Sequence, residues 1–201
     1  MKRFSVLLCT LLIVVGSCST SPPKKQEVPS VVTGNVQSNG DCVSQSPGSA
    51  YANGLVNLAT KGTASQSSTG HWSWDASPGL ANDGNSDGDY WGHSVSHTLE
   101  EHRAWWQVDL GDVYSIEKIV IWNRTDGGWG KRLSNFNLIV LDSSNNPVFE
   151  QTYCRGGKFF NPAMVVDMAR ITNGRHVKIM LNGKNYLQLA EVEIFAKNLG
   201  I

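Results

Sequence analysis

Short apolar segments alternate with turn residues along the chain from Leu55 onward, and this pattern predicts β-strands. The two clearest segments, 177–181 and 190–194, carry an apolar residue at every second position, as half-buried strands of an antiparallel sheet do. No segment of helical length repeats its apolar residues with a helical period. The expected strands lie at Trp105–Leu110, Ile116–Trp122, Phe136–Leu141, Val148–Tyr153, Val177–Leu181 and Leu187–Phe195.

Turn residues between these segments indicate the fold class. Asn145-Asn146 precedes Pro147, and Asn182-Gly183 follows another strand segment; both are typical of tight turns. Many short strands joined by turns favour an all-β fold, either a β-sandwich or a barrel. Loops at one end of such a scaffold are the usual place for a binding site.

The N-terminal segment has the features of an export signal. A basic start precedes an apolar run, Val6–Val15, that is too short to span a bilayer as a mature helix. The run ends at Gly16-Ser17-Cys18, which resembles the lipobox of bacterial lipoproteins. We therefore expect a signal peptide at 1–17 and lipidation of Cys18. A signal peptide with an incidental cysteine is the alternative.

The following stretch predicts a membrane tether. Residues 18–53 are rich in small and polar residues and have few large apolar side chains, so they cannot bury enough surface to fold alone. The folded domain is expected at 54–201. Ser19 follows the proposed anchor, and a residue other than Asp there favours transport to the outer membrane of a Gram-negative cell. The protein is thus expected in the bacterial cell envelope, lipid-anchored at the outer membrane or the cell surface.

The four cysteines fit this division of the chain. Cys9 lies in the predicted signal and Cys18 is the predicted anchor, which leaves Cys42 and Cys154 in an oxidising compartment. A single disulfide between these two is a hypothesis that depends on their distance in the fold.

The charge balance argues against nucleic acid as a partner. Lys and Arg total 17, as do Asp and Glu, so no excess positive field would attract a phosphate backbone. The chain is instead rich in aromatic residues, with seven Trp and five Tyr. Their flat apolar faces serve either core packing or ligand contact.

An acidic segment at residues 80–91 offers a first candidate site. Carboxylates, glycines and exposed carbonyl groups alternate there, and these are the oxygen ligands that Ca²⁺ prefers. The spacing is not that of an EF-hand loop, and acidic turns of this kind are often merely solvated.

A second candidate site combines cationic and aromatic residues. Twenty-six residues separate His97 from Arg124, which is followed by Asp126 and Lys131. These side chains supply directional donors with Trp nearby, which suits an uncharged polyhydroxyl ligand that has one apolar face. A surface ion pair beside a structural histidine is the alternative.

The spacing in this second region is similar to a family motif. A His, twenty-six residues, an Arg, one residue, an Asp, four residues and then Arg or Lys is the signature of the F-type lectins, the fucolectin family. The chain resembles the motif at every fixed position, and the similarity continues through Trp105–Leu110 to Leu187–Glu193.

This resemblance implies a β-sandwich of the jelly-roll type, like the discoidin and galactose-binding domains, with a shallow fucose site in loops at one end. Asp126 would orient Arg124. Trp72 or Trp74 could instead pack in the core. The implied sugar-binding residues are His97, Arg124 and Lys131 as donors to hydroxyl groups and the ring oxygen, Tyr90 and Trp91 as contacts of the sugar's methyl group, and His71 and Trp72 for the next sugar.

The resemblance also implies a structural Ca²⁺ ion. The ion would brace the loops and so lower the ordering cost of binding without touching the sugar. The implied ligands are the carbonyl oxygens of Leu80, Asn85 and Ala190 and the side chains of Asp83, Ser94 and Glu191.

The chain departs from the family pattern at two places. Many members have two consecutive, mutually bridged cysteines after the Arg-x-Asp, where this chain has Gly127-Gly128. Trp129 is expected to supply the apolar contact that is lost. A second family disulfide is missing too, with Val95 and Ala190 at its two ends.

The expected function is therefore a calcium-braced lectin that binds terminal α-L-fucose on glycans, without catalysis, in cell adhesion. A glycosidase would need two carboxylates held across a cleft, and the best-placed candidates are assigned to the cation. The chain has no nucleophile elbow and no zinc-binding His-Glu motif. The alternative is a discoidin-type adhesion module for another glycan, a protein or a lipid. The oligomeric state is not indicated by the sequence.

Overall fold

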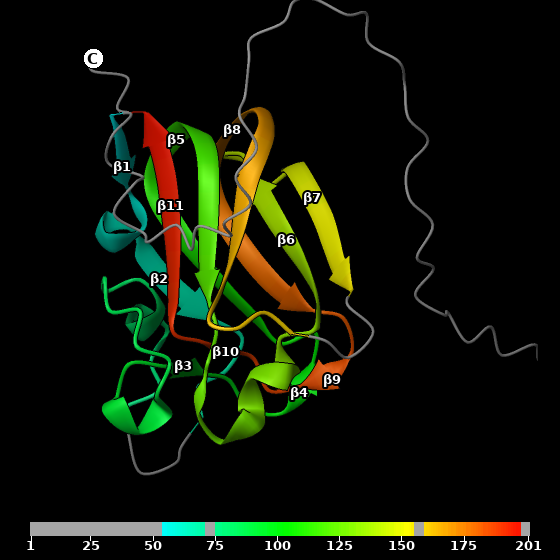
Figure 1. Cartoon of the computed structure of the whole chain (residues 1–201). Helices are drawn as coiled ribbons and strands as arrows, with labels where there is room; N and C mark the ends of the chain where they lie inside the picture. Colours follow the sequence, from blue (N-terminus) through cyan, green and yellow to red (C-terminus); the bar gives the residue numbers. More distant parts are fainter. Residues whose placement is uncertain (1–53, 71–74, 155–158, 198–201) are drawn as a thin grey trace, which may run out of the picture. The chain divides into compact units, whose positions relative to one another are not determined.

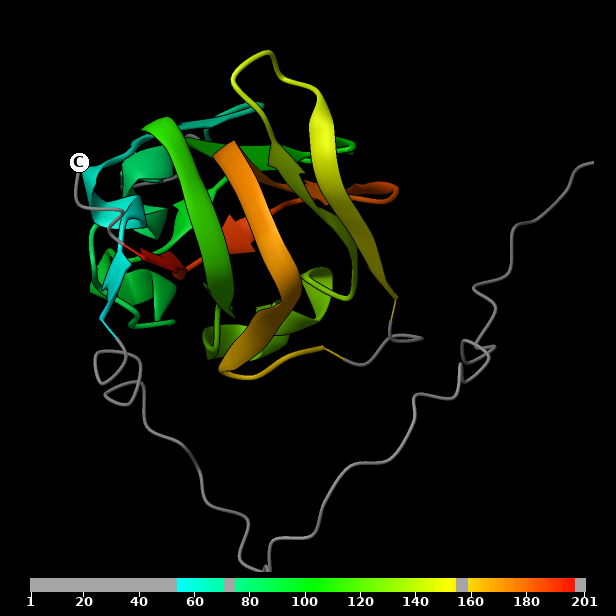
Figure 2. The ribbon, with the colours of Figure 1, turned by 90° about the horizontal axis from the view of Figure 1, so that it is seen from above.

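A computed structural model describes residues 54–70, 75–154 and 159–197, which form a β-sandwich of antiparallel strands (Figure 1, Figure 2). The predicted signal peptide and tether, with Cys18 and Cys42, lie outside the described residues, as do His71 and Trp72. In the described ranges, no helix combines the length and the apolar character needed to cross a membrane.

All helices in these ranges are short 3-10 segments, in agreement with the missing helical period in the sequence. They are η2 (Ala59–Lys61), η3 (Pro78–Ala81), η4 (Tyr90–Gly92) and η5 (Asp126–Arg132). The strands are β1 (Leu55–Asn57), β2 (Thr63–Gln66), β3 (Ser96–His97), β4 (Glu101–His102), β5 (Trp105–Trp122), β6 (Asn135–Leu141), β7 (Pro147–Cys154), β8 (Ala163–Leu181), β9 (Lys184–Asn185), β10 (Gln188–Leu189) and β11 (Glu191–Lys197).

Two long strands, β5 and β8, contribute to both layers of the sandwich. The main sheet has the order β1-β11-β5-β8-β6-β7, and β2 also pairs with β5. Residues 105–109 of β5 pair with β2 and with the second half of β8, whereas residues 116–122 pair with β11 and with the first half of β8. The register of β5 on β8 shifts between Asp109 and Tyr114.

The core lies between the two layers and follows the predicted alternation. In β8, Val177 and Ile179 have no exposed surface, and the same holds for Val192 and Ile194 in β11. The predicted inward side chains are therefore buried, but the strands are more than half-buried, because neighbours such as Met180 and Phe195 are buried as well. This burial is the main apolar contribution to stability.

The structure differs from the strand prediction in three ways. The segments 105–110 and 116–122 form one strand, because Gly111 takes a φ of +86° at the register shift and lets the strand continue. The segment 187–195 is interrupted at Ala190, whose N–H donates to the Trp122 carbonyl at 3.0 Å. The first half of β8 was not predicted, because Val165 in the middle of it is 56% exposed and masks the alternation.

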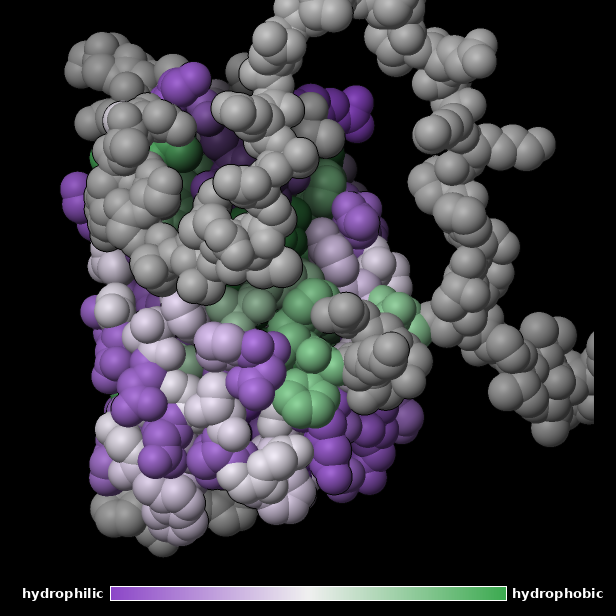
Figure 3. Space-filling view, viewed as in Figure 1, coloured by the Kyte–Doolittle hydropathy of each residue, from purple (hydrophilic) through white to green (hydrophobic). Residues whose placement is uncertain are grey.

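The short elements η4, η5, β3 and β10 gather at one end of the sandwich (Figure 1). Figure 3, in the same orientation, shows that hydrophilic residues and residues of intermediate hydropathy dominate this end of the visible face. The layers thus supply a rigid base, and the polar chemistry lies on the loops that it carries.

Candidate functional site

Loops at this end of the sandwich line an open cavity of about 410 Å³. Cavities that hold small molecules are commonly about 300–1,000 Å³. Its wall combines aromatic faces with strong hydrogen-bond donors. The lining residues are Tyr90, Trp91, His97, Arg124, Trp129, Arg132 and Tyr186.

Arg124 lies just after the end of β5, is buried, and is held from two directions. Its Nε donates to Asp126 Oδ1 at 2.6 Å and its Nη2 donates to Asp126 Oδ2 at 2.7 Å. The guanidinium group also lies over the Tyr90 ring, 4.5 Å from its centroid. These contacts fix the plane of the guanidinium group before any ligand arrives.

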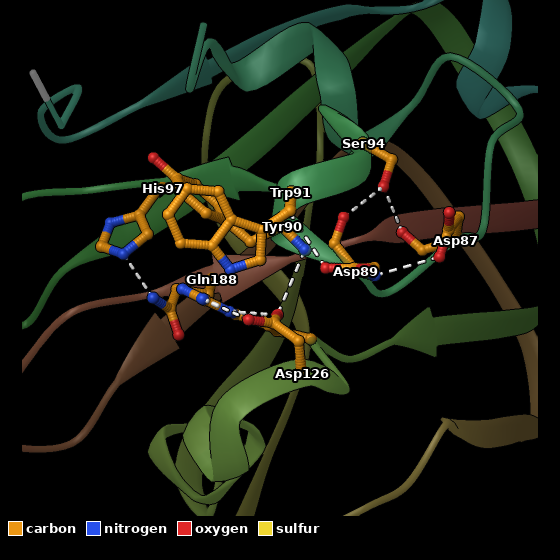
Figure 4. Close-up of polar contacts among 9 residues, drawn as sticks. Asp87, Asp89, Tyr90, Trp91, Ser94, His97, Asp126 and Gln188 are labelled. Carbon is orange, nitrogen blue, oxygen red and sulfur yellow. Dashed lines mark hydrogen bonds and ion pairs between the residues drawn. The ribbon is translucent and has the colours of Figure 1, made fainter. Parts of the chain in front are cut away.

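Asp126 joins two walls of the cavity. Besides the bonds from Arg124, its Oδ1 accepts from the Tyr90 N–H at 3.1 Å (Figure 4). The hydrogen bonds from Arg124 hold the pKa of the Asp126 carboxyl below its usual range, although burial opposes this shift. Asp126 is therefore a carboxylate at neutral pH and positions both the arginine and the η4 segment.

His97 lies in β3 and is 4% exposed. Its Nδ1 is 2.7 Å from the Thr98 carbonyl oxygen, and its ring makes edge contacts with Tyr90 and Tyr186. Burial lowers the pKa of His97 to about 4, against the opposing effect of the Thr98 bond. The imidazole is therefore neutral at neutral pH.

Arg132, rather than the predicted Lys131, supplies the second guanidinium or ammonium group of the cavity. Lys131 is exposed and does not line the cavity. The Arg132 guanidinium lies between two aromatic rings, 4.3 Å from the centroid of Trp129 and 4.4 Å from that of Tyr186. Burial, with a smaller effect of the Arg124 charge, lowers the pKa of Arg132.

The backbone of η5 explains this difference from the sequence motif. Gly127 and Gly128 both have positive φ, at 58° and 69°, and kink the segment at its start. A 3-10 helix places residues three apart on one face, so Trp129 and Arg132 point to the cavity together. Trp129, which was expected from the sequence as an apolar contact, lines the cavity. Its three-residue spacing to Arg132 could have identified Arg132 as the second cationic side chain of the site.

The acidic segment folds into a ladder of Asx turns. The side chains of Asp83, Asn85, Asp87 and Asp89 each accept a hydrogen bond from the backbone N–H two residues further on, at 2.8 to 3.1 Å. The buried Ser94 hydroxyl closes the loop by donating to the Asp87 carbonyl at 2.5 Å (Figure 4). This ladder leads directly into η4 and so carries Tyr90 and Trp91 to the cavity.

Glu191 lies next to this loop with an unsatisfied carboxylate. The residue is 1% exposed, and its Oε1 accepts from the Gly84 N–H at 3.2 Å. Its Oε2 is buried without a hydrogen-bond partner. Burial, together with the neighbouring carboxylates, raises the pKa of Glu191 to about 8. A hard cation would satisfy this oxygen, so the donor set fits the Ca²⁺ ion expected from the sequence.

Other implied ligands of the cation lie in the same region. Asp83 begins the Asx ladder, and Ser94 and Ala190 are fully buried. The described residues contain no group of three or more His, Cys, Asp or Glu side chains placed to hold a metal. The expected site differs from such a group because half of its ligands are backbone carbonyls.

Apolar packing occupies the place of the second missing family disulfide. Val95 and Ala190 are buried against Tyr90, with Trp122 at the edge of the cluster. Cys154, at the end of β7, is disulfide-bonded. Because Cys42 lies outside the described residues, its pairing with Cys154 stays a prediction.

Comparison with known proteins places the chain in a family. A family model described as the NedA-like, galactose-binding domain matches residues 80–179. Fucolectin-5 of Anguilla japonica is 35% identical over 144 residues, which cover 70% of this chain and 76% of the relative. The chain belongs to the fucolectin family. This agrees with the family resemblance of its His-Arg-Asp motif and confirms the discoidin-like β-sandwich.

Solved structures agree with this assignment. The lectin domain of lectinolysin, solved with the Lewis b antigen, is 39% identical with a TM-score of 0.65 and covers 71% of this fucolectin and 97% of its own chain. A fucose-binding module of Streptococcus pneumoniae is 37% identical with a TM-score of 0.65, covering 72% and 100%. These relatives are lectins and binding modules, and this confirms that the chain is not an enzyme.

Proposed function

We propose that this fucolectin binds terminal α-L-fucose on glycans, in the cavity lined by Arg124, Arg132 and His97. The observation that carries the proposal is a cavity lined by two fixed guanidinium groups, an imidazole and four aromatic rings, with the guanidinium groups stacked on the rings. The named fucose-binding relatives support it.

The chemistry of the cavity suits a deoxyhexose. Guanidinium N–H groups donate to hydroxyl and ring oxygens, and they keep their charge at any physiological pH. Trp91 is 65% exposed and Trp129 is 40% exposed, so both rings are accessible to an apolar methyl group. His71 and Trp72 remain candidates for contact with the next sugar. A shallow site of this kind suggests a dissociation constant for one sugar of about micromolar to millimolar.

We further propose that a structural Ca²⁺ ion braces the acidic loop. Its support is the buried, unsatisfied Oε2 of Glu191 beside a loop rich in oxygen atoms. The residues that would hold the ion are those implied by the sequence, namely the carbonyls of Leu80, Asn85 and Ala190 and the side chains of Asp83, Ser94 and Glu191. The ion would supply charge compensation for Glu191 and hold η4 in place.

A lipid anchor on Cys18 would display the lectin at the bacterial cell surface. Its support is the lipobox-like Gly16-Ser17-Cys18 at the end of the apolar run. Many copies on one membrane would raise the retention of fucosylated partners through avidity, because each binding event is weak. Metabolic labelling with a fatty acid tests this, and labelling that survives Cys18→Ser would contradict it.

A titration with α-methyl-L-fucoside, beside a glycan array, tests the sugar site. We expect saturable binding to fucosylated glycans that is lost in Arg124→Met and kept in Lys131→Met. Binding of a protein or lipid that survives Arg124→Met, with no response to fucose, would instead support the discoidin-type alternative.

A further inference from the structure

Gln188 contacts both guanidinium groups and the imidazole that line the cavity. It lies in β10, directly opposite His97 in the pairing of β10 with β3, so the two side chains lie side by side (Figure 4). With its amide oxygen turned toward the donors, Oε1 lies 2.7 Å from Arg132 Nη1 and 2.9 Å from Arg124 Nη1. The same oxygen contacts Nε2 of His97.

The chemistry of the arginines fixes the orientation of this amide. Guanidinium groups only donate hydrogen bonds, so the atom shared by Arg124 and Arg132 has to be the amide oxygen. A nitrogen there would place N–H groups against N–H groups. Asp126 forms its ion pair with Arg124 and not with Arg132. The shared amide oxygen faces both guanidinium groups and therefore reduces the repulsion between their charges.

Gln188 lies beneath the cavity and does not fill it. The residue is 2% exposed and is not among those that line the cavity. Arg124 uses Nε and one N–H of Nη2 for Asp126 and one N–H of Nη1 for Gln188. Its second Nη1–H and second Nη2–H take no part in these bonds, so a sugar can bind them without displacing the glutamine.

We propose that Gln188 is a positioning residue of the sugar site, whose amide oxygen is the common acceptor that holds His97, Arg124 and Arg132 at their mutual spacing. The inference rests on the proposed function of this cavity. A neutral side chain outside the His-Arg-Asp motif would then determine how accurately these three side chains are placed. A hydrophobic residue of equal size would keep the packing and lose the array.

The experiment compares Gln188→Met, Gln188→Glu and the exposed control Gln151→Met in the full mature chain. Isothermal titration with α-methyl-L-fucoside gives the affinity, and a thermal melt shows that each variant folds. We expect Gln188→Met to bind at least about ten-fold more weakly, since hydrogen bonds to charged groups are lost. Gln188→Glu keeps an acceptor oxygen and should recover most of the affinity, and Gln151→Met should match the wild type.

A second readout separates positioning from simple stability. Both ring nitrogens of His97 face oxygen atoms, those of Thr98 and Gln188, and a neutral imidazole has a single N–H to share between them. Nitrogen NMR of the imidazole should show the Nδ1–H tautomer enriched in Gln188→Met, because Thr98 is then the remaining acceptor. An unchanged tautomer ratio would contradict the proposal.

The outcomes distinguish this inference from the proposed function. If the wild type does not bind the fucoside, the proposed function is wrong, and the tautomer ratio still tests the contact of Gln188 with His97. If the wild type binds and Gln188→Met binds equally well or more tightly, the positioning role is overturned.

Discussion

Arg124 and Glu191 are both buried ionisable residues at the loop end of the sandwich, but their partners differ. Arg124 has a carboxylate on one edge, the Gln188 amide on another and the Tyr90 ring on its face. Glu191 has one backbone N–H on Oε1 and no partner on Oε2. Arg124 contacts the Tyr90 ring of η4, and Glu191 contacts Gly84 in the acidic loop that leads into η4.

The difference separates cationic donors that are ordered without a ligand from a carboxyl group that lacks a partner without one. The donors of the cavity are ordered by contacts within the chain, so little ordering has to accompany sugar binding. The acidic loop is ordered by Asx turns, yet it leaves a buried carboxylate oxygen that needs a cation. Loss of an arginine should therefore damage the sugar site directly, whereas loss of a cation should act on it through η4.

The largest effect is expected for Arg124→Met, which removes the central donor. Affinity for α-methyl-L-fucoside should fall by about 100-fold or more, because several charge-assisted hydrogen bonds are lost together. The melting temperature should fall as well, since Asp126 keeps its charge beside Tyr90 without an ion pair. Calorimetric titration and a thermal melt measure both. A variant that binds within a few-fold of the wild type would show that Arg124 is only structural.

The second prediction compares two neighbours on η5. Arg132→Met should weaken fucoside binding by about 10- to 100-fold, because one or two hydrogen bonds to a charged group are lost. Lys131→Met should change the affinity by less than about two-fold, because its side chain is exposed outside the cavity lining. The reverse result would mean that the family motif, and not the fold of η5, identifies the donor.

This pair of residues also shows how far the sequence could predict the site. The motif places an Arg or Lys seven positions after Arg124, and Lys131 meets that rule. Which of two adjacent side chains faces the cavity depends on the backbone phase of η5, which the positive φ values of Gly127 and Gly128 determine. Motif spacing contains no information on that phase. His97, Tyr90 and Trp91 were expected from the family resemblance, and all three line the cavity.

Gln188 and Tyr186 were not predicted for a different reason. They reach the site through the pairing of β10 with β3 and through the turn before it, contacts between segments about ninety residues apart. Alternating apolar residues predicted a strand at 187–195 but not its partner. Alternation within each segment therefore made the β-sandwich predictable as a class, but it did not show that two predicted strands merge into β5.

The third prediction concerns removal of the cation. Calcium at about 100 times its dissociation constant should add about 2.7 kcal/mol to the free energy of unfolding. Chelation should lower the melting temperature and weaken fucoside binding by about 5- to 10-fold, through disorder of η4. Glu191→Gln removes the negative charge and should abolish the response of the melting temperature to Ca²⁺, and exposed Glu150→Gln is the matched control. An equal response to Ca²⁺ in wild type and Glu191→Gln would contradict the assignment.

The smallest effect is expected for pH, because His97 is already neutral. Its pKa is about 4 in the folded chain against 6.5 for an unperturbed imidazole. Fucoside affinity should therefore stay within about two-fold from pH 8 to pH 5 and fall near pH 4, where an imidazolium would form beside Arg124 and Arg132.

Stability should respond to pH earlier than affinity does. Between pH 6.5 and 4 the unfolded chain binds the His97 proton and the folded chain does not, so the contribution of His97 to the free energy of unfolding falls as the pH is lowered through this window. The loss at pH 4 should be on the order of 3 kcal/mol. His97→Gln should remove this slope, and His102→Gln, in an exposed position, should keep it. If instead affinity falls with a midpoint near 6.5, then His97 is solvated in the working site, and the ordered donor array that distinguishes the cavity from the acidic loop does not persist in solution.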